Sequence, residues 1–157
     1  MNTIIYLILA FIIVVLLGIL MKMFPNKTDY KVSYNNFTLK NSILTSNELN
    51  FYRILEIALQ NRYLICPKVT LFDYIENKNI SDFNSIRGKH CDFLICNKDL
   101  KPLCAIELDD STHLSKKAFK NDNFKNELFK TIGLKLVRIK VSNSYNPLEI
   151  REKIINT

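Results

Sequence analysis

The chain of 157 residues contains no tryptophan and has only 3 glycines, 2 histidines and 4 cysteines. The glycines are scattered, so a glycine-rich loop that cradles phosphates is excluded. The cysteines show no Cys-x-x-Cys spacing, which excludes the common zinc-finger arrangements. Because they lie within or beside apolar runs, we expect thiols of a protein core in a reducing compartment.

The beginning of the chain is uncharged and apolar. The run from Thr3 to Met21 is about as long as the roughly 20 residues that a helix needs to cross a bilayer. We predict a retained transmembrane anchor over residues 1–23 rather than a cleaved signal peptide, because the run has neither a positive start nor a small-residue cleavage site. Lysines follow the run and none precedes it, so the positive-inside rule predicts a single-pass membrane protein with a cytoplasmic C-terminal domain.

The rest of the chain divides into a polar linker, residues 24–41, and a segment of single-domain size, residues 42–157. Every charged residue follows the apolar run, and 22 basic against 15 acidic side chains give a net charge of +7. This charge favours a polyanionic partner, which is either nucleic acid or the anionic surface of a membrane.

Hydrophobic periodicity and helix-stop signals predict an α/β domain. A capping box at Thr45 and Glu48 opens a helix, and Gly133 ends a second long helix. The segment 77–89 is expected to be irregular. We predict a helix, three strands, a helix, a strand and a helix, in which helices cover the faces of a hairpin-built sheet. In this order the expected elements are residues 46–61, 64–72, 91–96, 103–109, 114–132, 134–141 and 147–155.

Carboxylates interrupt two of the apolar strands, where a buried charge is expensive unless a positive group lies beside it. If the turn 98–101 closes the hairpin symmetrically, Asp92 lies opposite Glu107, and Asp109 shares their face of the sheet. Such a cluster of hard oxygen ligands predicts Mg²⁺ or Mn²⁺ rather than zinc. The alternative is that Asp92 begins an exposed edge strand and Asp109 belongs to an ordinary turn.

The order of these residues resembles the PD-(D/E)XK, or restriction-endonuclease-like, superfamily: Glu48 in a helix, Asp92 in a strand, and Glu107-Leu108-Asp109 in the next strand. The local sequence around them is more similar to the bacterial family called domain of unknown function 2726, which is related to very-short-patch-repair-like nucleases. The stretches that carry this likeness are Cys91-Asp92-Phe93, Ile106 to Asp110 with His113, Asn121-Asp122, and Gly133 to Ile139, within roughly residues 44–145.

The resemblance implies a divalent-metal-dependent nuclease that hydrolyses phosphodiester bonds in nucleic acid, in DNA more than in RNA, and the apolar run adds the membrane anchor. It implies that Asp92 and Glu107 hold Mg²⁺ or Mn²⁺. Members of the superfamily have a lysine two residues beyond the glutamate, where this chain has Asp109. Either Lys120 or Lys125 supplies the missing positive charge, or Asp109 ligates a second metal while His113 acts as acid or base. Patch-repair-like enzymes, which also lack this lysine, favour the second arrangement.

Several of these residues also have simpler interpretations. Glu48 is either a capping residue, a site residue or both, and His113 is either a helix-start residue or a proton donor. Lys120 and Lys125 are either solvated or in contact with phosphates. The alternative function is a catalytically inactive nucleic-acid-binding or scaffolding module on the same fold, and a third is a membrane adaptor whose basic face meets anionic lipid.

Overall fold

A computed structural model of the chain describes residues 2–23, 32–109 and 116–155. The chain divides into two compact units, residues 1–39 and 40–157. Residues 24–31 of the expected linker lie outside the described part.

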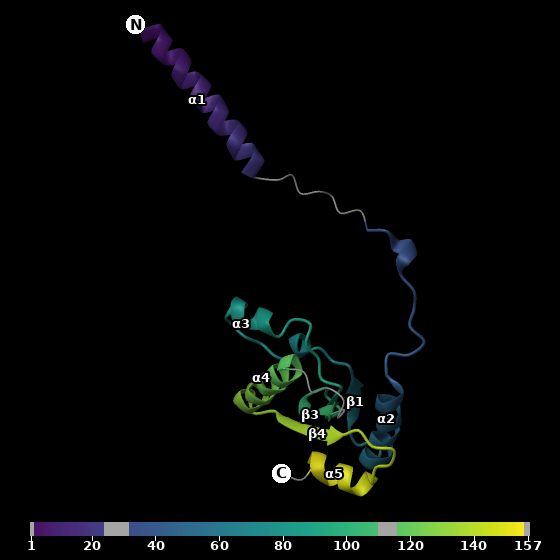
Figure 1. The fold of residues 1–157 in the computed structure, drawn as a ribbon. Coiled ribbons are helices and arrows are strands. Elements are labelled where there is room, and N and C mark those ends of the chain that lie inside the picture. Colours follow the sequence, from purple (N-terminus) through teal and green to yellow (C-terminus); the bar gives the residue numbers. More distant parts are fainter. Residues whose placement is uncertain (1, 24–31, 110–115, 156–157) are drawn as a thin grey trace. The chain divides into compact units, whose positions relative to one another are not determined.

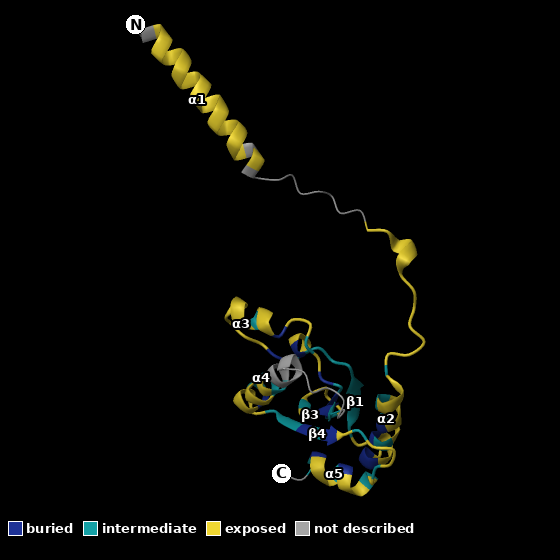
Figure 2. Cartoon of the chain, viewed as in Figure 1, coloured by how far each residue is buried: buried dark blue, intermediate teal, exposed yellow. Residues whose placement is uncertain are grey.

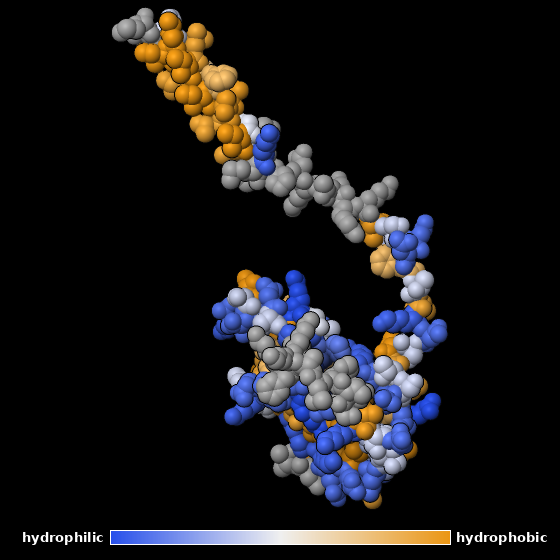
Figure 3. All heavy atoms as spheres, viewed as in Figure 1, coloured by the Kyte–Doolittle hydropathy of each residue, from blue (hydrophilic) through white to orange (hydrophobic). Residues whose placement is uncertain are grey.

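The first unit contains one long helix, α1 (Asn2–Met23), and a short 3₁₀ turn, Tyr34–Asn36. Within α1 the 18 residues Thr3–Leu20 form a window long and apolar enough to cross a membrane, and none of it is buried. Figure 3 shows hydrophobic side chains over the visible surface of this helix. By length and composition α1 suits a membrane anchor or a signal sequence equally.

The second unit is built on a mixed sheet of four strands in the order β1-β2-β3-β4, of which β1, β3 and β4 are labelled in Figure 1. Antiparallel pairing joins the first three strands, and β4 runs parallel to β3. The crossover between the parallel strands is the helix α4 (Lys116–Ile132). The strand bounds are β1 Leu64–Pro67, β2 Phe93–Cys96, β3 Pro102–Asp109 and β4 Lys135–Lys140. The predicted α/β class with helices around a hairpin-built sheet is therefore confirmed.

Each face of the sheet has its own hydrophobic cluster. Helices α2 (Ser46–Leu59) and α5 (Pro147–Ile155) pack on one face against Phe93, Ile95 and Ile106. On the other face, α4 places Phe129 against Ala105 and Leu94. Figure 2 shows buried residues in the sheet and on the helix sides turned toward it. Successive residues of β2 and β3 thus pack into different clusters, because side chains along a strand point alternately to its two faces.

Two details differ from the sequence prediction. A short helix, α3 (Ile80–Ser85), lies inside the segment expected to be irregular, because the side chain of Asn79 caps it by accepting bonds from the amides of Ser81 and Asp82. The hairpin is not symmetric at its turn: Cys96 pairs with Pro102, which leaves an irregularity beside Ile95. From Ile95 back to Phe93, farther from the turn, the pairing is regular.

The helix ends agree with the expected signals. Thr45 and Glu48 form the complete capping box of α2, and Gln60 closes that helix in the left-handed conformation. Gly133, with a φ of 68°, follows the last residue of α4. The start expected for this helix, residues 114 and 115, lies outside the described residues.

Candidate metal and phosphate site

The two interior strands bring Asp92 and Glu107 to neighbouring positions. Phe93 at the start of β2 pairs with Ile106 of β3, so the next positions along the two strands are Asp92 and Glu107. Because β2 and β3 both have a strand on either side, the alternative of an exposed edge strand is wrong. The predicted opposition of these two carboxylates is confirmed, and it depends on the regular part of the hairpin.

Glu107 is the buried carboxylate of the site. It is 8% exposed and is the one buried charged residue among those that the structure describes. Its Oε1 accepts a hydrogen bond of 2.6 Å from Nζ of Lys125 on α4, and the same ammonium donates at 2.8 Å to the carbonyl of His90. Burial raises the pKa of Glu107, and the nearby Lys125 opposes that rise. The ion pair with Lys125 therefore favours the charged carboxylate, whereas desolvation favours the neutral acid.

Asp92 uses both of its carboxylate oxygens. Oδ2 accepts the backbone amide of Leu108 at 2.8 Å, which ties the residue to β3. Oδ1 accepts Nζ of Lys68 at 3.0 Å. The same ammonium lies 2.5 Å from Oε1 of Glu48, so Lys68 bridges two carboxylates from different elements. Although burial lowers the pKa of Lys68, its hydrogen bonds to Glu48 and Asp92 raise that pKa overall.

Glu48 has both of the roles left open by the sequence. Its Oε2 accepts the backbone amide of Thr45 at 2.9 Å, which completes the capping box. Its other oxygen accepts Lys68, whose second partner is Asp92. The first turn of α2 thus fixes Glu48 close to Asp92.

Asp109 lies on the expected face of β3, but its carboxylate has a structural partner. Its Oδ1 accepts a 2.7 Å hydrogen bond from Arg138 of β4, and its side chain is 41% exposed. Arg138 also donates to Asp122 and Asn126 of α4. Two residues beyond Glu107, the chain therefore has an acid that is paired with an arginine.

The expected cluster of three converging carboxylates is not assembled in the described part of the chain. There, no group of three or more His, Cys, Asp or Glu side chains has the spacing of a metal site. Lys68 and Lys125 bind the carboxylates instead, so the charge repulsion expected between Asp92 and Glu107 is offset by two ammonium groups.

The remaining predicted residues divide between those described and those not described. Lys125 reaches into the site, as the first of the two arrangements predicts. His113 and the side chain of Lys120 lie outside the described residues. His90 lies next to the site, and burial, followed by the charges of Lys68 and Lys125, lowers its pKa.

Sequence reasoning missed Lys68. It lies 20 positions from Glu48 and 24 from Asp92, and a lysine after a short strand has no distinguishing pattern. The one local signal is Pro67, which ends β1 and is followed by the turn that directs Lys68 toward the site.

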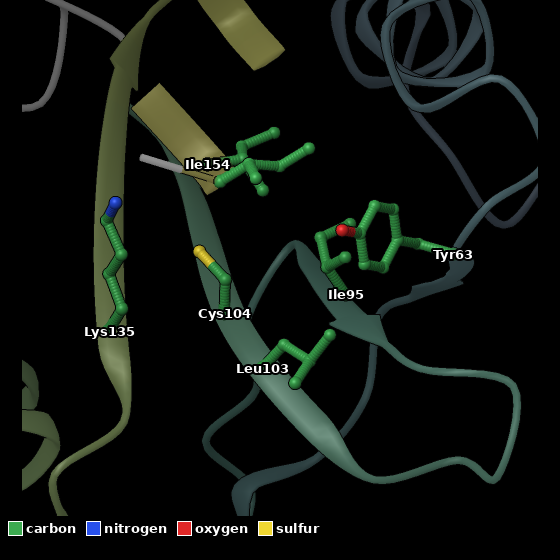
Figure 4. A pocket seen from close by; sticks show the side chains of 7 residues that line it. Tyr63, Ile95, Leu103, Cys104, Lys135 and Ile154 are labelled. Carbon is green, nitrogen blue, oxygen red and sulfur yellow. The ribbon is translucent and has the colours of Figure 1, made fainter. Parts of the chain in front are cut away.

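A separate pocket of about 230 Å³ lies at the opposite end of β3 (Figure 4). Leu103 and Cys104, at the start of the strand, contribute to its wall, whereas Glu107 and Asp109 lie near the strand's end. No carboxylate lines this pocket among the described residues, and most of its lining is apolar. It shares no lining residue with the carboxylate site.

Comparison with known proteins gives one relationship. No curated protein and no solved structure matches the chain. Residues 40–157, which include the whole sheet and its covering helices, match the family described as Protein of unknown function (DUF2726). The chain therefore belongs to the DUF2726 family.

Proposed function

We propose that residues 42–157 form a restriction-endonuclease-like domain that hydrolyses phosphodiester bonds in nucleic acid with Mg²⁺ or Mn²⁺. The observation that supports this most is the placement of Glu107 on β3 beside Asp92, which directly precedes β2, each with a lysine at its carboxylate. A buried Glu107 and a partly buried Asp92 that only stabilised the fold could be replaced by apolar residues at little cost. Such a pair is therefore a candidate for chemistry.

The donor chemistry fits a hard divalent cation. Asp92 and Glu107 offer carboxylate oxygens, Glu48 lies close enough to Asp92 to share one ammonium with it, and Mg²⁺ and Mn²⁺ prefer oxygen ligands. In the proposed site Asp92 and Glu107 hold the cation, with Asp109 as a further ligand if it leaves Arg138. A bound cation of this kind supplies Lewis acidity to a phosphodiester and to an attacking water.

In this proposal a lysine supplies the positive charge that the acid Asp109 cannot supply to the transition state. In the proposed reaction Lys125, which lies 2.6 Å from Glu107, takes the role of the missing lysine by stabilising negative charge on the phosphoryl oxygens. This is the first of the two arrangements considered from the sequence. His113 stays a candidate proton donor for the leaving oxygen.

The proposed substrate is DNA rather than RNA, on the resemblance to patch-repair-like nucleases. The net charge of +7 supports a polyanionic substrate, and in this proposal Lys120 and Lys125 on α4 lie along its phosphates. Binding to DNA should weaken as the salt concentration is raised, and each contact between a lysine and a phosphate should add to this dependence.

The test is cleavage of labelled single- and double-stranded DNA and RNA by the detergent-solubilised full chain, with Mg²⁺ or Mn²⁺. The matched variants are Glu107→Gln, which keeps the shape of the side chain, and Lys153→Gln on α5, which changes a charge outside the site. We expect the parent and Lys153→Gln to cut and Glu107→Gln not to cut. Equal cleavage by Glu107→Gln would place the activity elsewhere.

A second function is a catalytically inactive nucleic-acid-binding or scaffolding module. The observation that favours it is that Asp92 and Glu107 already have lysine partners, so the carboxylates are neutralised without any metal. Salt-sensitive DNA binding that is equal in the parent and in Glu107→Gln, without cleavage by either, would support this module.

We also propose that α1 anchors the domain to the lipid bilayer as a single transmembrane helix, with the C-terminal domain in the cytoplasm. The uncharged window of 18 residues and the lysine in the last turn of the helix, Lys22, support this arrangement. The mass of the protein and the cell fraction that contains it distinguish an anchor from a signal sequence. A retained anchor gives the full-length mass in the membrane fraction. A cleaved signal sequence gives a chain that is lighter by that segment and is released from the membrane.

A further inference from the structure

We propose that Lys68 is an internal cation that competes with the divalent metal ion for Glu48 and Asp92. When no metal is bound, its ammonium holds the two carboxylates together. When metal is bound, the ammonium is displaced while Lys68 stays tethered at the edge of the site. This inference deepens the proposed function, since it rests on that site binding a divalent cation.

The contacts of Lys68 are those expected for an ion that occupies a cation position. Nζ lies 2.5 Å from Glu48 and 3.0 Å from Asp92, and the side chain is only 27% exposed. These carboxylates come from the helix α2 and from the residue directly before β2, which are far apart in sequence. Without a cation between them, two partly buried negative charges would face each other and repel.

The backbone of Lys68 is also held in an uncommon conformation. Its φ is 53°, in the left-handed region that non-glycine residues rarely adopt. Its own amide donates a 2.9 Å hydrogen bond to the carbonyl of Asp92. Lys68 is therefore fixed to Asp92 through the main chain as well as through the side chain, so displacement of the ammonium need not move the backbone.

Both carboxylate oxygens of Asp92 already accept a hydrogen bond while Lys68 is bound. Oδ2 accepts the Leu108 amide at 2.8 Å and Oδ1 accepts Lys68. The amide bond belongs to the strand framework, so the oxygen that can be released is the one facing Lys68. Glu48 is in the same state, because Oε2 is held by the Thr45 amide and Oε1 by Lys68. Within Glu48 and Asp92, the two oxygens that no backbone amide holds are thus the two that Lys68 occupies.

Lys125 differs from Lys68 in this respect. It contacts one carboxylate, Glu107, and its second partner is a backbone carbonyl, so it does not bridge two acids in the described contacts. It can stay in place beside a bound cation. The competition is therefore assigned to Lys68 alone.

The test measures Mn²⁺ affinity of the detergent-solubilised full chain from the electron paramagnetic resonance signal of free Mn²⁺. The variants are Lys68→Met, which removes the charge, Lys68→Arg, which keeps it, and Lys130→Met, which removes a charge from the exposed last turn of α4. Lys68→Met is expected to bind Mn²⁺ about tenfold more tightly than the parent, the size of one charge-assisted hydrogen bond that no longer has to be broken. Lys68→Arg and Lys130→Met are expected to bind as weakly as the parent.

Three outcomes overturn the proposal: unchanged or weaker Mn²⁺ binding by Lys68→Met, an equal gain in Lys130→Met, and no Mn²⁺ binding by any form. The first shows that Lys68 does not compete, the second that only the overall charge matters, and the third that no cation site exists. Cleavage is scored separately. A chain that cuts DNA while Lys68→Met binds Mn²⁺ like the parent overturns this inference and leaves the nuclease intact. A tenfold gain in Mn²⁺ affinity by Lys68→Met, without cleavage by any form, supports this inference and contradicts the nuclease activity.

A measurement on the parent covers the case in which Lys68→Met fails to fold. The lysine ammonium signals in a ¹⁵N spectrum are followed during a Mg²⁺ titration, and the Lys68 signal is assigned by its loss in Lys68→Arg. We expect the Lys68 signal to shift or broaden on saturation while that of Lys130 stays unchanged. A Lys68 signal that is constant throughout the titration overturns the proposal.

Discussion

Nζ of Lys125 lies 2.6 Å from Oε1 of Glu107, joining α4 to the interior strand β3 across the face of the sheet. The two residues are 18 positions apart, and both side chains are largely buried. This contact places a positive charge beside the buried acid, whereas position 109, two residues beyond Glu107 on β3, is an aspartate.

Replacing Lys125 by methionine should destabilise the domain. A buried Glu107 without its partner costs about 3 kcal/mol of unfolding free energy. Because burial already raises the pKa of Glu107, that side chain can become neutral when the pH is lowered, and the loss should shrink with it. Urea denaturation at about pH 8 and at about pH 5 measures both effects. Lys130→Met is the control, and an equal loss in both variants at both pH values would contradict the assignment.

Replacing Asp109 by asparagine should have a small effect on stability. The side chain is 41% exposed and its ion pair with Arg138 is solvated, so the expected loss is less than about 1 kcal/mol. We also expect Asp109→Asn to weaken Mn²⁺ binding less than Asp92→Asn does, because Arg138 draws Asp109 toward α4. Denaturation and Mn²⁺ titration of the two variants decide this. A larger loss of Mn²⁺ affinity in Asp109→Asn would identify Asp109 as a principal ligand.

The buried thiols should make the domain lose stability in alkali. Burial raises the pKa of Cys91, Cys96 and Cys104 to about 11 in each case. Unfolded thiols ionise at a pKa of about 8.5, so between about pH 8.5 and pH 11 the unfolded chain releases protons that the folded chain keeps, and stability falls. Urea denaturation in steps across this range measures the slope. The Cys104→Ala variant should have a shallower slope, and a slope equal to that of the parent would exclude this thiol as a cause.

Replacing Thr45 by alanine should cost about 1 kcal/mol, the usual value of a helix N-cap. Its hydroxyl accepts the amide of Glu48, and Glu48 in turn accepts the amide of Thr45. Ser46→Ala, at the exposed first residue of α2, is the matched control. Thermal unfolding of both variants is the measurement, and an equally small effect in each would mean that the capping box adds nothing to stability.

Local patterns predicted much of the fold correctly. The capping box at Thr45 and Glu48, the stop at Gly133 and the alternation along β3 each depend on residues that are neighbours in sequence. The opposition of Asp92 and Glu107 could be predicted because a hairpin determines its own register. The short helix α3 was missed because a six-residue helix has too few turns to show periodicity, although Asn79 is a recognisable cap.

The sequence by itself determined the apolar helix α1, the α/β class, and the pairing of Asp92 with Glu107, because all three follow from composition or from residue spacing within adjacent elements. Only the tertiary structure decided which positive groups reach those carboxylates. Lys68 enters from the turn after β1, Lys125 from the crossover helix, and Arg138 turns Asp109 toward that same helix. Such contacts depend on how helices pack on a sheet, and a long flexible side chain shows no periodic signal of the partner it will meet.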